Sequence, residues 1–124
     1  AHVFLNDGTY GCMDELVLTG VIDRISILTP EGVKRSGARE AKIVFGPTCD
    51  SVDRLPGDIA LPAAIAEGDY VVIAGMGAYS TATNTPFNGF GAVTIVKSRG
   101  STPSSTSFHV SGVDTPANSL ARAL

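Results

Sequence analysis

The sequence predicts an all-β domain, arranged as a barrel or a sandwich, on three observations. Short apolar runs rich in Val and Ile recur along the chain, and Gly, Pro, Asn and Asp separate them, which is typical of strands joined by turns. Stretches with helical character are few and short. The length of 124 residues allows one hydrophobic core, which would bury roughly two thirds of the surface that the unfolded chain exposes.

Five segments read as strands in chain order. Residues 2–8 form an apolar run that ends in an Asn-Asp-Gly turn. Residues 16–32 alternate apolar and polar side chains in their second half and close at a Pro-Glu-Gly turn. Residues 39–48 are the third run, and residues 67–80 begin at a Gly-Asp turn with a nearly continuous apolar centre, as expected for a strand covered on both faces. Residues 90–98 are the last clear strand.

Helix and tail complete the expected organisation. Residues 61–68 have the composition of one helical turn, and residues 118–124 that of a short terminal helix. From residue 99 the chain is rich in Ser, Thr and Pro, which is typical of a tail or a loosely held edge. Only residues 107–110, SFHV, resemble a strand there. The sequence therefore predicts a β-domain over 1–98 and a tail over 99–124.

The composition excludes several classes of partner. Charged residues make up 17% of the chain, and nine Lys and Arg against twelve Asp and Glu leave a net charge of −3 with no basic block. This balance argues against nucleic acid and anionic membranes as partners. No apolar run approaches the roughly 20 residues that span a bilayer, and the first residues lack a signal-peptide pattern. We expect a soluble, cytoplasmic protein with no bound metal, because the two cysteines form no CxxC pair.

The stretch 45–54, FGPTCDSVDR, places a thiol in a polar loop where an apolar strand ends. Loops at strand ends often hold functional residues, and a cysteine acts chemically when its surroundings tune the thiol and leave it accessible. Cys49 is therefore a candidate functional residue. The alternative is a half-buried loop cysteine whose acidic neighbours cap the turn. Cys12 lacks such a setting, and we expect it to be a small packing residue.

Residues 75–90, GMGAYSTATNTPFNGF, form the second unusual segment. Gly75 and Gly77 allow a close approach of the backbone, and Tyr79 adds a phenol before a run of hydroxyl residues. Glycines beside hydroxyls can hold a phosphate, but neither a P-loop nor a GxGxxG pattern is present. The alternative is that the glycines mark a bulge or close packing.

The remaining residues of chemical interest carry no catalytic prediction. His2 and His109 have no carboxylate or Ser partner at an interpretable spacing. Lys34, Lys42 and Lys97 lie near turns or on strand faces, where nothing desolvates them for Schiff-base chemistry.

Four blocks in order, FLNDGTYG, FGPTCDSVDR, GDYVVIAGMGAYS and FNGF, resemble the C-terminal β-domain of the pyridoxal-phosphate-dependent ornithine, lysine and diaminopimelate decarboxylases of fold type III. The ornithine/lysine branch is the most similar, and the resemblance covers about residues 3–96. It implies a Greek-key-like β-barrel or sandwich, the C-terminal domain of a two-domain enzyme whose (β/α)8 barrel holds the cofactor and is absent here. Since the chain starts without Met, we expect that the front of a larger protein is missing.

The resemblance also implies a function. The family decarboxylates basic amino acids such as ornithine or lysine to diamines, in polyamine biosynthesis, as a homodimer with shared active sites. Cys49 resembles the residue that returns a proton to the carbon that loses CO2, and Asp50 the acid that pairs with the distal ammonium of the substrate. Tyr79 resembles a tyrosine that binds the cofactor phosphate, and Phe87 a ring that lines the substrate pocket. Alone, the fragment is expected to be inactive.

One departure from the pattern leaves the substrate open. Where eukaryotic-type ornithine decarboxylases carry a Tyr-Asp pair, this chain has Leu18 and Thr19. One expected carboxylate is therefore missing, unless Asp23 or a residue of the barrel replaces it, and the substrate could be ornithine, lysine or a related diamino acid. The alternative function is a catalytically silent β-domain that binds decarboxylase subunits and regulates their assembly. A plain ligand-binding β-barrel would require the order of the four blocks to be a coincidence.

Overall fold

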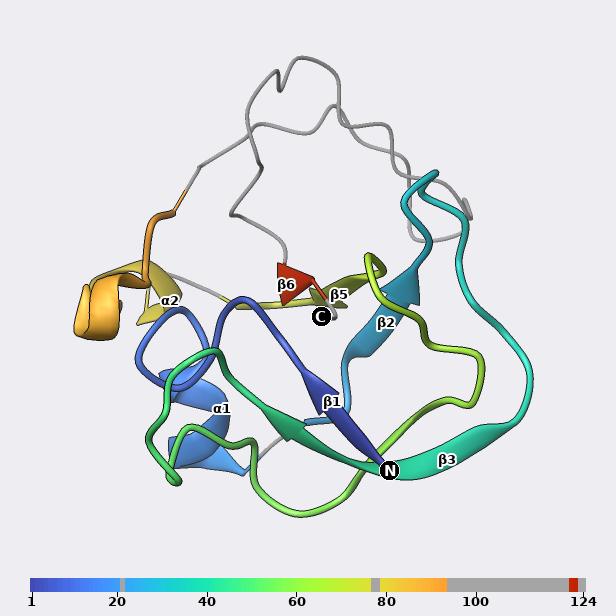
Figure 1. The fold of residues 1–124 in the computed structure, drawn as a ribbon, viewed down its shortest axis with the longest axis horizontal. Coiled ribbons are helices and arrows are strands. Elements are labelled where there is room, and N and C mark those ends of the chain that lie inside the picture. Colours follow the sequence, from blue (N-terminus) through green and yellow to red (C-terminus); the bar gives the residue numbers. More distant parts are fainter. Residues whose placement is uncertain (21, 77–78, 94–120, 123–124) are drawn as a thin grey trace.

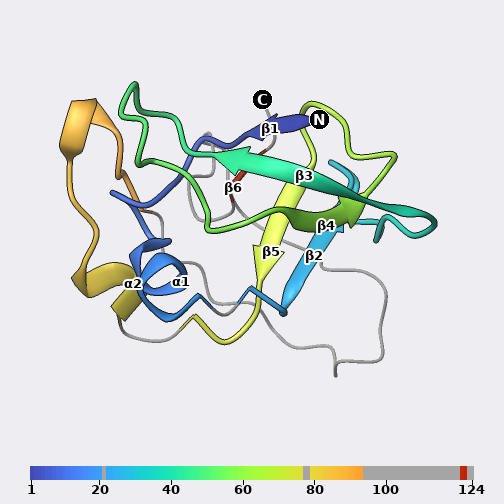
Figure 2. The same ribbon diagram turned by 90° about the horizontal axis from the view of Figure 1, so that it is seen from below.

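The computed structural model describes residues 1–20, 22–76, 79–93 and 121–122. Its strands form two three-stranded sheets, and short helices gather at one end of the molecule (Figure 1). In the view of Figure 2 the strands of the first sheet run across those of the second. The predicted all-β class is confirmed, and among the described residues the two sheets do not close into a barrel.

The first sheet has the order β1-β3-β4. It consists of β1 (His2–Phe4), β3 (Arg39–Phe45) and β4 (Ile59–Pro62). β1 lies parallel to β3, whereas β4 is antiparallel to it. The strands predicted over 2–8 and 39–48 are therefore confirmed over their first residues.

The second sheet has the order β2-β5-β6 and is antiparallel throughout. It consists of β2 (Ile25–Leu28), β5 (Tyr70–Ile73) and β6 (Ala121–Arg122). β6 pairs with the first half of β5, so the last described residues of the chain form an edge strand.

Both sheets and one helix contribute to a single aliphatic core. Its buried members are Val3, Leu5, Met13, Leu16, Ile27, Val44, Leu55, Ile59, Leu61 and Val71. Because apolar side chains from distant parts of the sequence share this core, burial holds the two sheets and the helix together. Within the described ranges, no helix has the length and apolar character needed to cross a membrane.

The prediction of a strand over residues 16–32 is wrong in its first part, which belongs to the helix α1 (Asp14–Thr19). Acidic residues occupy the first turn of α1, where they interact favourably with the helix dipole. Gly20 ends the helix in the left-handed conformation, with φ 67°, and its N–H donates to the carbonyl of Leu16. These end signals outweigh the strand propensity of Val and Leu, and the strand itself is confined to β2.

The prediction of a helical turn over residues 61–68 is also wrong at its start. Leu61 and Pro62 belong to β4, whose burial pattern places Ile59 and Leu61 in the core. Pro62 is tolerated because β4 is an edge strand, where a missing N–H leaves no ladder bond unmade. Pairing with β3 therefore decided the conformation of this segment.

The later elements were predicted less well. β5 confirms the centre of the strand expected over 67–80, but that strand stops before Tyr79–Ala82, which forms the short helix α2. A 3₁₀ turn, η1, follows over Phe87–Gly89. The helix expected over 118–124 is wrong at 121–122, because these residues pair with β5 as β6.

Three predictions for the C-terminal part of the chain fall wholly or partly outside the described residues. Residues 90–93 are not in a strand, and the rest of the strand expected over 90–98 lies outside the described residues. The strand-like residues 107–110 also lie outside them. The boundary between the domain and its tail at residue 98 stays a prediction.

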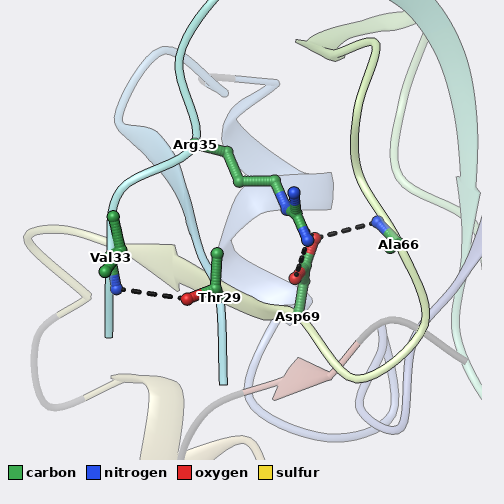
Figure 3. A network of polar contacts seen from close by, with 5 residues as sticks. All are labelled: Thr29, Val33, Arg35, Ala66 and Asp69. Carbon is green, nitrogen blue, oxygen red and sulfur yellow. Dashed lines mark hydrogen bonds and ion pairs between the residues drawn. The ribbon is translucent and has the colours of Figure 1, made fainter. Parts of the chain in front are cut away.

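A buried ion pair joins the loop after β2 to the turn before β5 (Figure 3). Asp69 is fully buried, with an exposed fraction of 0%. Its carboxylate accepts hydrogen bonds from Nε and Nη2 of Arg35, the latter at 2.9 Å. It also accepts one from the backbone N–H of Ala66 at 2.8 Å. Because three donors satisfy the carboxylate, the loop between β2 and β3 is tied to the second sheet.

We expect Asp69→Asn to destabilise the domain by about 2–4 kcal/mol, because the amide keeps only one acceptor oxygen, turns its NH2 group toward a donor of Arg35 or Ala66, and leaves the guanidinium without its counter-ion. Chemical denaturation followed by circular dichroism measures this change. Asp23→Asn, at an exposed carboxylate, is the control and should change the free energy of unfolding by less than about 0.5 kcal/mol. Equal effects of the two substitutions would contradict the role of the ion pair.

Candidate functional site

Three segments that are distant in the sequence meet at the end of the molecule that holds α1 and α2. The first is the loop after β1, residues 5–13, and the second is the loop after β3, residues 46–54. Both loops lie at the same end of the molecule as α1 and α2 in the two views (Figures 1 and 2). The third segment, residues 83–90, follows α2.

The buried carboxylate of Asp53 joins the first two segments. Only 1% of Asp53 is exposed. Its Oδ1 accepts the N–H of Thr9 at 2.8 Å, and its Oδ2 accepts the N–H and the hydroxyl of Thr48 at 3.0 and 2.6 Å. Leaving any of these donors without a hydrogen-bond partner would cost free energy, so the carboxylate fixes the positions of Thr9 and Thr48.

Two glycines make room for this carboxylate. A Cβ atom on Gly46 would lie 2.1 Å from Oδ1 of Asp53, and a Cβ atom on Gly8 would lie 2.2 Å from the same oxygen. Both approaches are far shorter than a van der Waals contact, so only glycine fits at these two positions. The glycines of the FGPTCD and NDGTYG motifs thus serve the packing of the two loops around Asp53.

Tyr10 connects all three segments. Its hydroxyl donates to Oδ2 of Asp50 at 2.5 Å, and its ring packs against Phe87 with a centroid distance of 4.3 Å. Its backbone carbonyl accepts the N–H and the hydroxyl of Thr85 at 2.8 and 2.9 Å. Tyr10 therefore lies at the centre of a group that we call the Cys49 cluster: Tyr10, Cys49, Asp50, Phe87 and Asn88.

The thiol of Cys49 is exposed at the edge of this cluster. The side-chain amide of Asn88 lies within hydrogen-bond reach of it, with 3.5 Å between Nδ2 and Sγ. Asn88 adopts the left-handed conformation, with φ 54°, which asparagine tolerates better than most residues. The thiol is thus accessible and has a polar neighbour.

Hydrogen bonds favour the ionised form of Asp50. The phenol of Tyr10 and then the N–H of Val52 hold the pKa of the Asp50 carboxyl below its usual range, and partial burial opposes them. The same bond, together with burial and the nearby carboxylates of Asp50 and Asp53, raises the pKa of the Tyr10 phenol. The pair therefore consists of a carboxylate anion and a neutral phenol at neutral pH.

Cys12 differs from Cys49 in its environment. It is partly buried at the start of α1, and its N–H donates to the carboxylate of Asp7 at 3.1 Å. Burial, the charge of Asp7 and a hydrogen bond to it raise the pKa of the Cys12 thiol to about 11. Cys12 is therefore a poor nucleophile at neutral pH.

The structure brings three of the four predicted site residues together, namely Cys49, Asp50 and Phe87. The fourth, Tyr79, opens α2 with 67% of its surface exposed. Among the described residues, no hydrogen bond or ring contact links the side chain of Tyr79 to the cluster. Sequence reasoning missed Tyr10 and Asn88, although both lie inside the quoted motifs, because nothing in a motif says which distant residue it will touch.

Asp23, expected to replace the missing carboxylate, and Gly75, expected to allow a close backbone approach, are not part of the Cys49 cluster, and Gly77 lies outside the described residues. Asp23 is exposed beside Arg24, and it lines a pocket of about 410 Å³ to which the Cys49 cluster contributes no residue. At Gly75, with φ 71°, a Cβ atom would lie 2.3 Å from the guanidinium of Arg24. The close approach expected at Gly75 is therefore to Arg24 of this chain.

Two polar groups at this end of the molecule suit parts of a ligand with opposite charges: Asp50, inside the Cys49 cluster, and Tyr79, outside it. The exposed phenol of Tyr79 can donate to a phosphate, and the ionised Asp50 can accept an ammonium group. Within the part of the chain that the structure describes, no group of three or more His, Cys, Asp or Glu residues could hold a metal ion.

Comparison with known proteins connects this geometry to a family. Residues 1–77 match the family described as the C-terminal sheet domain of pyridoxal-dependent decarboxylases. The chloroplastic ornithine decarboxylase of Nicotiana glutinosa is 35% identical over 98 residues, which cover 75% of this chain and 22% of the relative.

Solved structures of similar proteins agree with this match. The arginine decarboxylase of Paramecium bursaria Chlorella virus, bound to agmatine, superposes with a TM-score of 0.62 at 31% identity, over 73% of this chain and 24% of that protein. The lysine/ornithine decarboxylase of Vibrio vulnificus, complexed with cadaverine, has a TM-score of 0.58 at 36% identity, over 72% of this chain and 23% of that protein. The chain thus spans between a fifth and a quarter of the length of these relatives.

We expect Asp53→Asn to destabilise the domain by about 2–4 kcal/mol, because the NH2 group of the amide would face the donors of either Thr9 or Thr48. Urea denaturation measures the change. Asp58→Asn, at an exposed carboxylate, removes the same charge without a buried partner and should have little effect. A loss as large at Asp58 as at Asp53 would show that charge alone, not the buried network, matters.

The two cysteines should react at different rates with iodoacetamide at pH 8. Cys49 is exposed and should be alkylated first, whereas Cys12, with its raised pKa, has about one thiolate in a thousand molecules at that pH. Cleavage after Lys and Arg separates them into peptides 1–24 and 43–54, so mass spectrometry can follow each. Alkylation of Cys12 should accelerate as the pH rises toward 11, and both should react alike in the denatured chain. Faster labelling of Cys12 in the folded chain would contradict this assignment.

Proposed function

Because this chain belongs to the pyridoxal-dependent decarboxylases, as their C-terminal sheet domain, we propose that it completes the active site of an enzyme that decarboxylates basic amino acids. The observation that supports this most is the Cys49 cluster. An accessible thiol and an ionised carboxylate from the loop after β3 lie together there with an aromatic ring from the segment after α2, and Tyr10 of the first loop joins them. A proton donor, a cation acceptor and an apolar surface are what such a substrate requires.

The relatives indicate the substrate class. Agmatine and cadaverine, bound in the viral and the Vibrio enzymes, each carry a positive charge distant from the carbon that loses CO2. Asp50 is the residue of the cluster that can pair with such a charge. Leu18 and Thr19 have no acidic side chain, so these two positions add no carboxylate to the site. Leu18 is 77% exposed, and the hydroxyl of Thr19 donates to the carbonyl of Glu15. We propose that Asp50 supplies the anionic contact of this domain with ornithine or lysine.

Cys49 is the proposed proton donor. Bound pyridoxal phosphate supplies the electron sink that allows CO2 to leave. The thiol then delivers a proton to the carbon that has lost CO2, and its exposure allows a substrate to reach it. Phe87 would lie along the apolar part of the substrate, and the phenol of Tyr79 would donate to the cofactor phosphate.

The site is proposed to be shared between subunits of a homodimer. Cys49, Phe87 and Tyr79 are exposed on this domain, and exposed side chains of this kind fit a ligand that another surface presents. The barrel of the partner subunit would hold most of the cofactor, so the isolated chain should be inactive. A cytoplasmic location and a role in polyamine biosynthesis are part of this proposal.

We expect Cys49→Ala to lower kcat by about 10²- to 10⁴-fold in the enzyme that contains this domain, because general acid catalysis contributes a factor of this size. Release of CO2 from ornithine and lysine measures turnover, and chromatography of the products measures the fate of the intermediate. Cys12→Ala is the matched control and should retain wild-type turnover. Wild-type turnover and products with Cys49→Ala would refute the role of the thiol.

Mixed dimers test the sharing of the site within the same experiment. A Cys49→Ala subunit combined with a subunit that lacks the cofactor lysine of the barrel should regain about a quarter of the wild-type activity at random assortment, because one of the two sites in each mixed dimer is intact. No recovery in verified mixed dimers would place both groups on one subunit.

The uncharged residues at Leu18 and Thr19 favour one alternative, a silent domain that binds decarboxylase subunits and regulates their assembly. The gene sequence upstream of residue 1 distinguishes the two functions. A barrel with a cofactor lysine in the same reading frame supports the enzyme, whereas a start codon close to Ala1 supports the regulator.

A further inference from the structure

We propose that Tyr10 is a positioning residue for substrate binding, which orients the carboxylate of Asp50 toward the distal ammonium group and holds the ring of Phe87 beside it. The inference depends on the proposed function, because that function assigns the ammonium to Asp50. It adds a residue from the first loop to a site otherwise assigned to the second loop and to the segment after α2.

The two oxygens of Asp50 have different, fixed partners. Oδ2 accepts the hydroxyl of Tyr10 at 2.5 Å, and Oδ1 accepts the N–H of Val52 at 3.0 Å. These two bonds fix the rotation of the carboxylate about its Cβ–Cγ bond. Each carboxylate oxygen can accept a further hydrogen bond, so an ammonium group can bind without displacing either partner.

Tyr10 is itself held from two other directions. Its ring packs on Phe87, and its backbone carbonyl accepts both donors of Thr85. The preceding residue, Thr9, is fixed by Asp53. The phenol therefore has little freedom to turn, and a rigid donor orients the carboxylate at a lower entropic cost than a mobile one.

Asp50 and Tyr10 would therefore contribute to binding in different ways. Asp50 supplies the negative charge, while Tyr10 sets the distance between that charge and the apolar surface of Phe87. Removal of the hydroxyl alone should therefore weaken the binding of a substrate with a distal ammonium and leave the chemical step at the far end of the substrate unchanged.

Tyr10→Phe tests this in the enzyme that contains this domain, because it removes the hydroxyl and keeps the ring. We expect KM for the diamino acid to rise about 3- to 10-fold, the loss of one hydrogen bond, with kcat within about twofold of the wild type. Tyr70→Phe removes a phenol hydroxyl from β5 in the second sheet and should leave KM unchanged. An unchanged KM with Tyr10→Phe overturns the proposal.

Asp50→Asn separates this inference from the proposed function. If it raises KM while Tyr10→Phe does not, only the role of Tyr10 is wrong. If neither substitution changes KM, the assignment of Asp50 itself fails. If both act through one contact, Tyr10→Phe should add little to KM in the Asp50→Asn background, and full additivity would overturn the inference.

A carboxyl titration by NMR in the 124-residue chain gives a readout that does not depend on activity. The pKa of Asp50 should lie below its usual range in the wild type, and Tyr10→Phe should raise it, because the donor that favours the anion is lost. Among the described residues, the carboxylate of Asp53 also acts on the phenol of Tyr10, and it is present in both proteins. A pKa of Asp50 at or above its usual value in the wild type overturns the proposal, even if the variant does not fold.

Discussion

The buried carboxylate of Asp53 is the interaction on which the candidate site depends. It accepts three hydrogen bonds from two loops that β1 and β3 bring to the same end of the molecule. One set of donors adjoins Cys49 and the other adjoins Tyr10. A buried anion is stable only when such donors surround it, so the fold of the two loops and the charge of Asp53 require each other. The glycines at positions 8 and 46 leave room for this arrangement and for little else.

Two carboxylates three residues apart therefore have opposite tasks. Asp53 is buried and its donors come from the backbone and from Thr48, so it serves the architecture. Asp50 keeps contact with solvent, and its two bonds leave room for another donor. Asp69, which precedes β5 and pairs with Arg35 of the loop after β2, belongs to the first kind. Burial and the number of satisfied acceptors, more than residue type, distinguish a structural acid from one that can bind a ligand.

Several side chains of the candidate site are exposed to solvent. Cys49 and Phe87 are exposed on this chain, so the cluster resembles half of a pocket. In the proposed enzyme the other half comes from the barrel of the partner subunit, which would exclude water and strengthen the contact between Asp50 and the ammonium group. The rigidity that Asp53 and Tyr10 provide is then useful, because a loop that completes the site of another subunit must already have its final shape.

The sequence alone determined the all-β class, the strands β1, β2, β3 and β5 in outline, and the motifs that carry Cys49, Asp50 and Phe87. These features follow from local patterns: apolar β-branched runs, turn residues and short motifs with fixed spacing. The tertiary structure decided what local patterns could not. Pairing with β3 made a strand of Ile59–Pro62, and the helix Asp14–Thr19 places Leu16 in the core that both sheets share. The contact between Tyr10 and Asp50 joins residues 40 positions apart, and only the fold, by packing the loops around Asp53, brings a phenol from one motif to the carboxylate of another.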